Sequence, residues 1–279
     1  PHGHGSDKRD RSLMVTALTR GPLPYGRGSE GGTASRCHTS DGFSCNGSWV
    51  ALESPTIMER DASDEHVVTS PGDADNQSPQ LTPETPCPYL EDRVSQSEAY
   101  LVESLDPEVY RGLMARGFRR SGHVVYRPRC RGCRSCVPLR VEVDRFTPTR
   151  SMRRVLTRSP DVTMTVGELS PTEEKFELFC RYLDHQHDST MARSLDTFID
   201  FLYHSPAETF EFTYRCGADL VGVSIADRCE GGISSVYMYF DPAWSRRSPG
   251  TLSVLREIEH CRATGVRYYY LGYYIEGCA

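Results

Sequence analysis

The order of strands and helices between residues 209 and 275 constrains the fold most. Three segments rich in β-branched and aromatic residues follow one another, with short Gly-containing turns between them: 209–215, 220–227 and 233–240. This pattern is typical of antiparallel hairpins. A helix is predicted next, at 251–264, and a last strand at 266–275 (VRYYYLGYYI). A mostly antiparallel sheet that closes with a strand, a helix and a strand indicates an α+β fold.

The first 85 residues differ in composition from the rest. They are dense in Gly, Ser, Thr, Pro and Asp, and their apolar residues follow no sustained period. Such a segment cannot bury enough apolar surface to offset the entropy lost on ordering. We therefore expect residues 1–85 to be a disordered leader.

Residues 86–160 are expected to form a separate Cys- and Arg-rich module. A strand is predicted at 97–104, and Asp106 followed by Pro107 is a typical start of a helix. Residues 118–128 are expected to form a strand pair or ribbon. Residues 137–143 (VPLRVEV) alternate between apolar and polar side chains, which indicates a half-buried strand.

The cysteines of this module have the spacing of metal ligands. Cys130, Cys133 and Cys136 are separated by two residues each, and a C-x2-C turn directs two sulfurs at one centre. Cys87, at the start of the module, is the candidate fourth ligand. We expect one site for zinc or an iron–sulfur cluster, and the spacing does not decide between them. The alternative is that these cysteines are small buried apolar residues.

Arginine is concentrated around these cysteines. From Arg116 to Arg158 there are 13 Arg, no Lys and two acids, a formal charge of +11 in a chain of net charge −6. The planar guanidinium fork suits phosphate, so this segment is expected to contact RNA or DNA. The alternative is a solvated face on which some arginines pair with acids. A second candidate phosphate site is Arg246, Arg247 and Gly250, at the N-terminus of the last predicted helix.

The strand, loop and helix that surround this second site have the layout of an N-acyltransferase, in which the final two strands separate and hold the acyl donor between them. Candidates for catalysis along these strands are Tyr237, Tyr239 and Asp241. The sequence does not identify the catalytic base.

Several motifs together resemble one family. They are CPYL at 87–90, the segment 105–146, SMRRVL at 151–156, SSVYMYFDP at 234–242, RRSPGT at 246–251 and YYLGYYIEGC at 269–278. Their order is similar to that in the aminoacyl-tRNA–protein transferases of the N-degron pathway. The closer match is the bacterial aspartate/glutamate leucyltransferase branch, which is related to the arginyltransferases.

The resemblance implies transfer of an aminoacyl group from charged tRNA to the α-amine of proteins that begin with Asp or Glu, which marks them for degradation. It implies an N-terminal cysteine module at 86–160 and an acetyltransferase-like (GNAT-type) domain at 161–279. An aminoacyl ester is already activated, so no cofactor is required for transfer. Leucine is the favoured donor, and arginine is the alternative, with Glu276 or Asp241 as its carboxylate partner.

The arginines of both candidate sites are expected to divide between tRNA phosphates and the acidic acceptor. They are Arg119, Arg120, Arg153, Arg154, Arg246 and Arg247.

The sequence departs from the family pattern at three places. Pro249 removes a backbone donor from the phosphate loop, and Glu276 adds a carboxylate near the donor cleft. The chain stops at Ala279, where the family continues, so the domain is expected to be truncated at its C-terminus.

Two function classes other than this transfer remain open at this point. A non-catalytic RNA-binding knuckle explains the cysteines and arginines but gives the C-terminal half no role. An acetyl-CoA-dependent acetyltransferase does not explain the charge of the module. No secretory signal or membrane-length apolar run is present, and the 11 cysteines suggest no paired framework, so a cytoplasmic location is expected. The protein is also expected to be a monomer.

Overall fold

The computed structural model describes residues 78–186 and 193–275. Residues 1–77 of the predicted leader lie outside the described residues, as does Glu276. Within 78–186 and 193–275, no helix is both long and apolar enough to cross a membrane.

The N-terminal part contains a small antiparallel sheet with the strand order β1-β4-β6-β5. Its strands are β1 (Gln80–Leu81), β4 (Ser97–Leu101), β5 (Arg119–Ser121) and β6 (Val124–Pro128). A separate two-stranded sheet pairs β2 (Thr85–Pro86) with β3 (Val94–Ser95).

The predicted leader extends too far, because residues 78–85 already form structure. Gln80 of β1 pairs with Ala99 of β4. The Thr82 hydroxyl accepts a hydrogen bond from the Ser97 backbone N–H at 3.0 Å. A two-residue strand is held by backbone hydrogen bonds and needs no apolar period, so composition could not indicate it.

Helix α3 (Pro107–Ala115) begins as predicted. The Asp106 side chain accepts hydrogen bonds from the backbone N–H groups of Glu108 and Val109, at 2.8 and 3.2 Å. After the helix, Gly117 has a φ of +90°, a conformation that is accessible to glycine at little cost. The buried side of α3 packs with β4 and β6 in a small apolar core, to which Cys229 and Tyr270 also belong.

The larger sheet has six strands in the order β7-β12-β11-β10-β9-β8. They are β7 (Cys136–Glu142), β8 (Val162–Glu168), β9 (Thr209–Cys216), β10 (Asp219–Cys229), β11 (Gly232–Phe240) and β12 (Tyr268–Ile275). All neighbours are antiparallel except β11 and β12, which confirms the mixed α+β class with a mostly antiparallel sheet. Strand β7, predicted within the N-terminal module, is an edge strand of this sheet.

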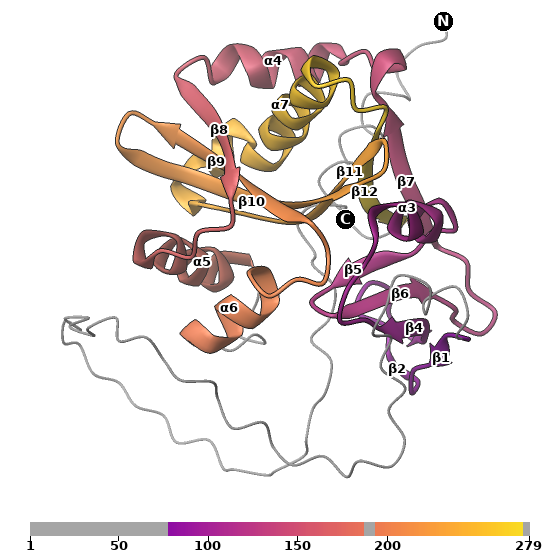
Figure 1. The fold of residues 1–279 in the computed structure, drawn as a ribbon. Helices are drawn as coiled ribbons and strands as arrows, with labels where there is room; N and C mark the ends of the chain where they lie inside the picture. The colour runs from indigo at the N-terminus through magenta and orange to yellow at the C-terminus, as the bar shows by residue number, and fades with distance from the viewer. Residues whose placement is uncertain (1–77, 187–192, 276–279) are drawn as a thin grey trace, which may run out of the picture. The chain divides into compact units, whose positions relative to one another are not determined.

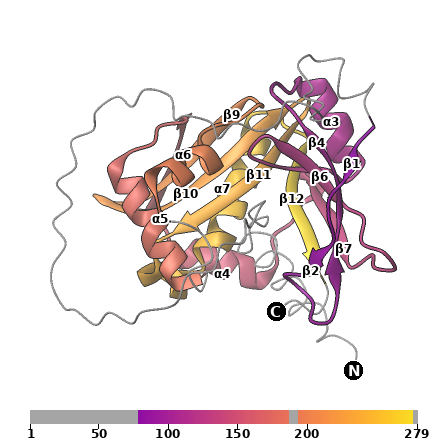
Figure 2. The same cartoon turned by 90° about the horizontal axis from the view of Figure 1, so that it is seen from below.

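Helices cover both faces of the six-stranded sheet (Figures 1 and 2). Helices α4 (Arg150–Arg158) and α7 (Pro249–Ala263) lie on one side, and α5 (Glu173–Gln186) and α6 (Leu195–Leu202) lie on the other. Short 3₁₀ helices, η1 (Val143–Arg145) and η2 (Pro242–Arg247), precede α4 and α7.

Alternation along the strands divides their aromatic side chains between the two faces. The Tyr214 hydroxyl reaches Glu257 of α7, whereas Tyr239 packs edge-on against Phe179 of α5, with ring centroids 5.6 Å apart. Both faces belong to one continuous apolar core.

Candidate active site

The two parallel strands β11 and β12 separate after a short contact. Their pairing is confined to Gly232–Ser234 with Tyr268–Tyr270, although β11 continues to Phe240 and β12 to Ile275. The pairing of β12 with β7 shifts register between Tyr270 and Gly272, and Gly272 has a φ of +84°. A bulge followed by a left-handed glycine bends a strand, so β12 follows β7 away from β11. We call the point of divergence at Ser234 and Tyr270 the fork.

Tyr237 and Tyr239, the predicted catalytic candidates on β11, lie inside the core beneath α5 and α6. Tyr237 packs against Phe201 of α6, with ring centroids 5.0 Å apart. The Tyr239 hydroxyl lies 3.3 Å from the Tyr203 hydroxyl. Burial raises the pKa of both phenols well above the ordinary value, so both stay protonated at neutral pH. A phenol in this state can donate a hydrogen bond but is a poor general base.

Asp241 is held in place at the end of β11. Its carboxylate accepts hydrogen bonds from the backbone N–H of Ala243 at 2.9 Å and from the Arg181 guanidinium at 3.2 Å. The first bond caps η2, and the second ties η2 to α5. Asp241 therefore has structural partners on both oxygens.

The predicted phosphate loop consists of η2 and the start of α7. Arg246 is exposed, but Arg247 makes two hydrogen bonds to the Asp161 carboxylate, at 2.8 and 2.9 Å, and stacks on Trp244. The guanidinium of Arg247 lowers the pKa of Asp161. Gly250 follows Pro249 in the first turn of α7, and its carbonyl accepts a hydrogen bond from Ser253. Arg247 is thus already paired with an acid, whereas Arg246 faces solvent.

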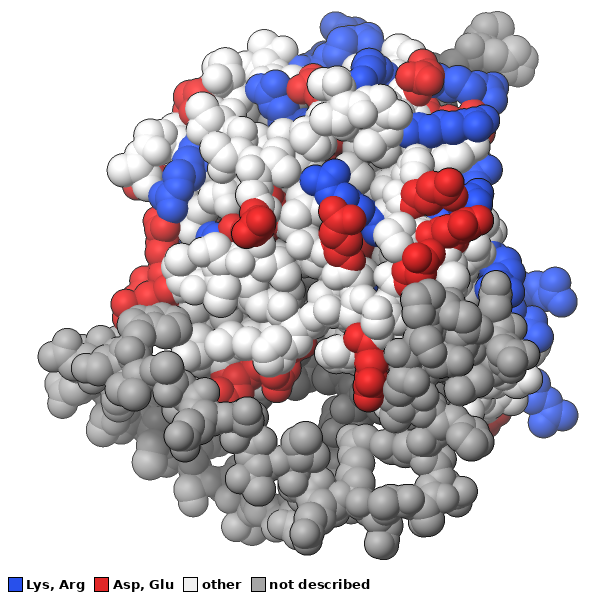
Figure 3. Space-filling view, viewed as in Figure 1, with Lys and Arg blue, Asp and Glu red and all other residues white. Residues whose placement is uncertain are grey.

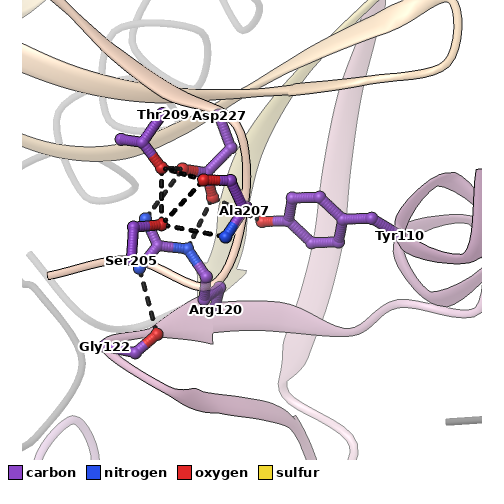
Figure 4. Close-up of polar contacts among 7 residues, drawn as sticks. All are labelled: Tyr110, Arg120, Gly122, Ser205, Ala207, Thr209 and Asp227. Carbon is purple, nitrogen blue, oxygen red and sulfur yellow. Dashed lines mark hydrogen bonds and ion pairs between the residues drawn. The ribbon is translucent and has the colours of Figure 1, made fainter. Parts of the chain in front are cut away.

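Arg119 and Arg120 of β5 are buried, which the Arg-rich sequence around them does not indicate. Arg120 binds the Asp227 carboxylate through Nε and Nη2, at 2.6 and 2.7 Å (Figure 4). The same carboxylate accepts hydrogen bonds from the hydroxyls of Tyr110 at 2.9 Å and Thr209 at 2.6 Å. This network ties α3 and β5 to β9 and β10 of the six-stranded sheet. Its role is to join the two parts of the structure, and Arg120 is not available to a substrate.

Arg119 lies on the other side of β5, beside β12. Its guanidinium donates hydrogen bonds to backbone carbonyls and lies over the rings of Tyr270 and Tyr273, 5.5 and 5.6 Å from their centroids. Unlike Arg120, it makes no ion pair with a carboxylate of the described residues.

Helix α4 carries Arg153 and Arg154 on its exposed side. Met152 and Val155 are buried, while Arg150, Arg154 and Arg158 recur every four residues and are exposed. The Arg153 side chain bonds the Pro148 carbonyl at 2.5 Å. Lys and Arg side chains gather at the upper edge of the molecule in Figure 3, where α4 lies in Figure 1. The helix contains no acidic residue, so its exposed face is uniformly cationic.

The predicted metal ligands Cys87, Cys130, Cys133 and Cys136 are not brought together as one group in the described part of the chain. In the described part of the chain, no group of three or more His, Cys, Asp or Glu side chains comes together as metal ligands. The Cys130 sulfur contacts the backbone of Gln96, and that of Cys133 lies 3.5 Å from the Ser135 hydroxyl. These contacts are ordinary thiol hydrogen bonds, and hydrogen bonding to Ser135 lowers the pKa of Cys133. We therefore assign no zinc ion or cluster to the described residues.

A buried carboxyl on α7 was not predicted from the sequence. Glu257 is fully buried and accepts hydrogen bonds from the hydroxyls of Tyr214 at 2.8 Å and Tyr269 at 2.5 Å. Burial raises its pKa to about 7, although these hydrogen bonds act in the opposite direction. The signal was available: Glu257 interrupts the apolar stripe of α7, between Val254 and Cys261.

Both parts of the chain are similar in sequence to known proteins. Residues 85–154 match the family described as "Arginine-tRNA-protein transferase, N terminus", and residues 174–279 match its C-terminal counterpart. The chain is 40% identical over 197 residues to an aspartate/glutamate leucyltransferase of Saccharophagus degradans. The matched region covers 69% of this chain and 84% of that protein. It is 38% identical over 202 residues to the protein of the same name from Alcanivorax borkumensis, covering 71% and 83%.

Likeness to solved structures is much weaker. The crystal structure of FemX gives a TM-score of 0.39 at 9% identity, over 65% of this chain and 64% of that chain. The sequence matches, in contrast, span both parts of the fold described above. This chain therefore belongs to the arginine-tRNA-protein transferase family and is an aminoacyltransferase.

Proposed function

We propose that the enzyme transfers leucine from Leu-tRNA to the α-amine of proteins that begin with Asp or Glu, which marks them for degradation. The observation that carries this proposal is the similarity to proteins named aspartate/glutamate leucyltransferase, over more than four fifths of their length. The expectation of a cytoplasmic monomer belongs to the same proposal.

The fork between β11 and β12 is the place that we propose for the aminoacyl group. Divergent parallel strands leave backbone N–H and C=O groups without a strand partner, and such groups are suited to bind an acyl donor. The arrangement is the one expected of an acetyltransferase-like (GNAT-type) domain, and we propose this relationship for residues 161–279. Residues 86–160 would then be the module that completes the substrate sites.

The transfer reaction requires few catalytic functions of the protein, because an aminoacyl ester is already activated. The enzyme must bring the amine to the ester carbonyl, accept a proton from the amine and stabilise the oxyanion. Tyr237 and Tyr239 keep their protons, so we propose neither as the base. No cofactor is needed for these steps.

The partners of Asp241 favour leucine over arginine as the donor. An arginyl group would require a carboxylate, and Asp241 already accepts hydrogen bonds from Arg181 and Ala243. A leucyl group requires only apolar surroundings, and Tyr270 and Leu271 of β12 are buried residues of the apolar cores near the fork. Glu276, the other candidate carboxylate, lies outside the described residues.

The exposed face of α4 is our proposed contact for tRNA phosphates. Among residues 78–186 and 193–275, no carboxylate pairs with the exposed side chains of Arg150, Arg154 and Arg158. Arg153 flanks this stripe, and Arg246 is an exposed arginine of η2. Of the arginines predicted for the site, Arg120 no longer belongs to this proposal.

A transfer assay tests the proposed substrates. Leu-tRNA and Arg-tRNA are each offered with peptides that differ only in a first residue of Asp, Glu, Asn or Ala. We expect leucine to be added to the Asp and Glu peptides. Equal transfer to the Ala peptide would contradict the acceptor assignment, and exclusive use of Arg-tRNA would contradict the donor assignment.

A further inference from the structure

Arg119 and Arg120 are adjacent and similarly buried, but only the charge of Arg120 is paired with a carboxylate. Their exposed fractions are 5% and 4%. Arg120 holds the Asp227 carboxylate in a two-bonded ion pair, as described above. Arg119 has no carboxylate within ion-pair distance among residues 78–186 and 193–275. A buried cation without a counter-charge is costly, so the two sites differ in kind.

The partners of Arg119 are neutral. Nη1 donates to the carbonyl oxygens of Phe118 at 2.6 Å and Met114 at 3.4 Å, and Nη2 donates to that of Leu139 at 2.9 Å. The Nε–H is buried and has no hydrogen-bond partner within the described part of the chain. Tyrosine rings on β12 supply cation–π contacts. These contacts hold the guanidinium in a fixed position but leave its charge unpaired.

Burial lowers the pKa of the Arg119 guanidinium, the direction expected of a cation that has lost water without gaining an anion. An arginine side chain nevertheless remains charged in proteins. The position therefore presents a permanent positive charge in a poorly hydrated environment, where a bound anion would be strongly favoured.

The edge of the guanidinium that carries Nε and Nη2 indicates which kind of anion the Arg119 side chain would bind. In Arg120, this edge binds the two oxygens of Asp227. In Arg119, the same edge has an unpartnered Nε and an Nη2 that donates to one neutral carbonyl. A planar group with two acceptor oxygens matches this edge, and a carboxylate is such a group. A tRNA phosphodiester, which is extended by chain on both sides, is unsuited to so buried a group.

The position of Arg119 links this edge to the proposed reaction site. Its guanidinium lies over Tyr270, the last residue of β12 that pairs with β11, and over Tyr273 beyond the bulge. The strand that carries Arg119 also lies against β11. A carboxylate on this edge would therefore be bound beside the fork.

We propose that Arg119 recognises the side-chain carboxylate of the acceptor's N-terminal Asp or Glu through its Nε–Nη2 edge. This inference rests on the proposed function, because it assigns a residue to the acceptor rule stated there. An Asn side chain would bring an amide NH₂ against one of these donors, and the buried donor would then have no acceptor.

Acceptor kinetics test the assignment. The full chain is assayed with Leu-tRNA and with two peptides that differ only in an N-terminal Asp or Asn. The variants are Arg119→Gln, Arg119→Lys and, as a matched control, Arg140→Gln, since Arg140 is an exposed arginine that stacks on Tyr268 at 4.4 Å. The ratio of kcat/KM for the Asp peptide to that for the Asn peptide is the readout.

We expect the wild type and Arg140→Gln to prefer the Asp peptide by about 30-fold or more. Arg119→Gln should reduce this preference to within about 3-fold through the KM for the peptide, with the KM for Leu-tRNA unchanged. Arg119→Lys keeps the charge but loses the planar fork, so it should show an intermediate preference.

Three other results have distinct meanings. Equal losses on both peptides in Arg119→Gln would show a purely structural role and would overturn the proposal. A wild type without preference for Asp would refute the acceptor rule of the proposed function. If Arg119→Gln does not fold, Arg119→Lys decides: a preference equal to that of the wild type would overturn the assignment.

Discussion

Arg120 and Asp227 form a buried ion pair between β5 and β10, with N–O distances of 2.6 and 2.7 Å. The two residues lie 107 positions apart in the sequence. Tyr110 and Thr209 donate to the same carboxylate, so elements from both parts of the fold meet at Asp227 (Figure 4). This contact is one of several that attach the N-terminal part to the six-stranded sheet.

Asp227→Asn should destabilise the protein strongly. The change leaves the Arg120 guanidinium buried without its counter-charge, and breaking a buried pair in this way costs about 3–5 kcal/mol. Urea denaturation gives the free energy of unfolding. Glu208→Gln is the control, because it removes an exposed partner of Arg228 and should cost less than about 1 kcal/mol. Similar losses in both variants would contradict the assigned role of Asp227.

The burial of Glu257 predicts a loss of stability at rising pH. Its pKa is raised from the ordinary value of 4.5 to about 7 in the folded protein. Between these two pH values the native state therefore binds more protons than the unfolded state. The stability that protonated Glu257 contributes is fully present below pH 4.5 and is lost as the pH rises through about 7. A shift of this size corresponds to about 3 kcal/mol.

Glu257→Gln removes the ionisation. Its amide oxygen can accept a hydrogen bond from one of the two hydroxyls, Tyr214 or Tyr269, and its NH₂ can donate to the other. Urea denaturation at pH 5 and pH 8 should show a larger loss of unfolding free energy in the wild type than in the variant. Parallel losses in the two proteins would mean that Glu257 does not titrate in this range.

Substituting alanine for Gly272 or for Gly112 should change the stability of the protein in opposite directions, because the two glycines have different backbone conformations. Gly272→Ala places a side chain at a φ of +84° and should cost about 1–2 kcal/mol while reducing transfer activity at the fork. Gly112→Ala lies inside α3 with open space around the added carbon, and it should stabilise the protein by up to about 1 kcal/mol. Thermal denaturation and the transfer rate check both. An active, fully stable Gly272→Ala enzyme would show that the bend is not needed.

The arginine stripe of α4 predicts a salt-dependent contact with tRNA. Arg154→Gln should weaken tRNA binding and reduce the slope of log K against log salt by about 0.7–0.9, the value for one phosphate contact. Arg111→Gln is the control, because Arg111 is an exposed arginine already paired with Glu230. Titrations at several salt concentrations measure both slopes. An unchanged slope in Arg154→Gln would remove that residue from the tRNA site.

The sequence predicted those features that depend on local patterns. The strands at 209–240 have alternation and Gly turns, and the start of α3 has Asp106 and Pro107 in adjacent positions. Both signals lie within a few residues of the structure that they specify. The strand β1 has only two residues and no period, so composition placed it in the leader.

The functions of the arginines and cysteines required contacts that the local sequence does not contain. Arg119 and Arg120 belong to the same Arg-rich run as Arg154, but only the first two are buried. What distinguishes them is contact with residues that are distant in the sequence: Arg120 pairs with Asp227, and Arg119 lies over the rings of Tyr270 and Tyr273. In the same way, the spacing of Cys130, Cys133 and Cys136 shows that the thiols are near one another in the chain, not that they converge on a metal.

The proposed transfer of leucine to an N-terminal α-amine is tested most directly by identifying the bond that the enzyme makes. The full chain is incubated with isotopically labelled Leu-tRNA and a peptide that begins with Asp and contains one internal Lys, and the product is sequenced by mass spectrometry. We predict one added leucine, joined by an amide to the α-amine of Asp, and none when that amine is acetylated. Leucine on the Lys side chain, or no addition to the free peptide, would contradict the account.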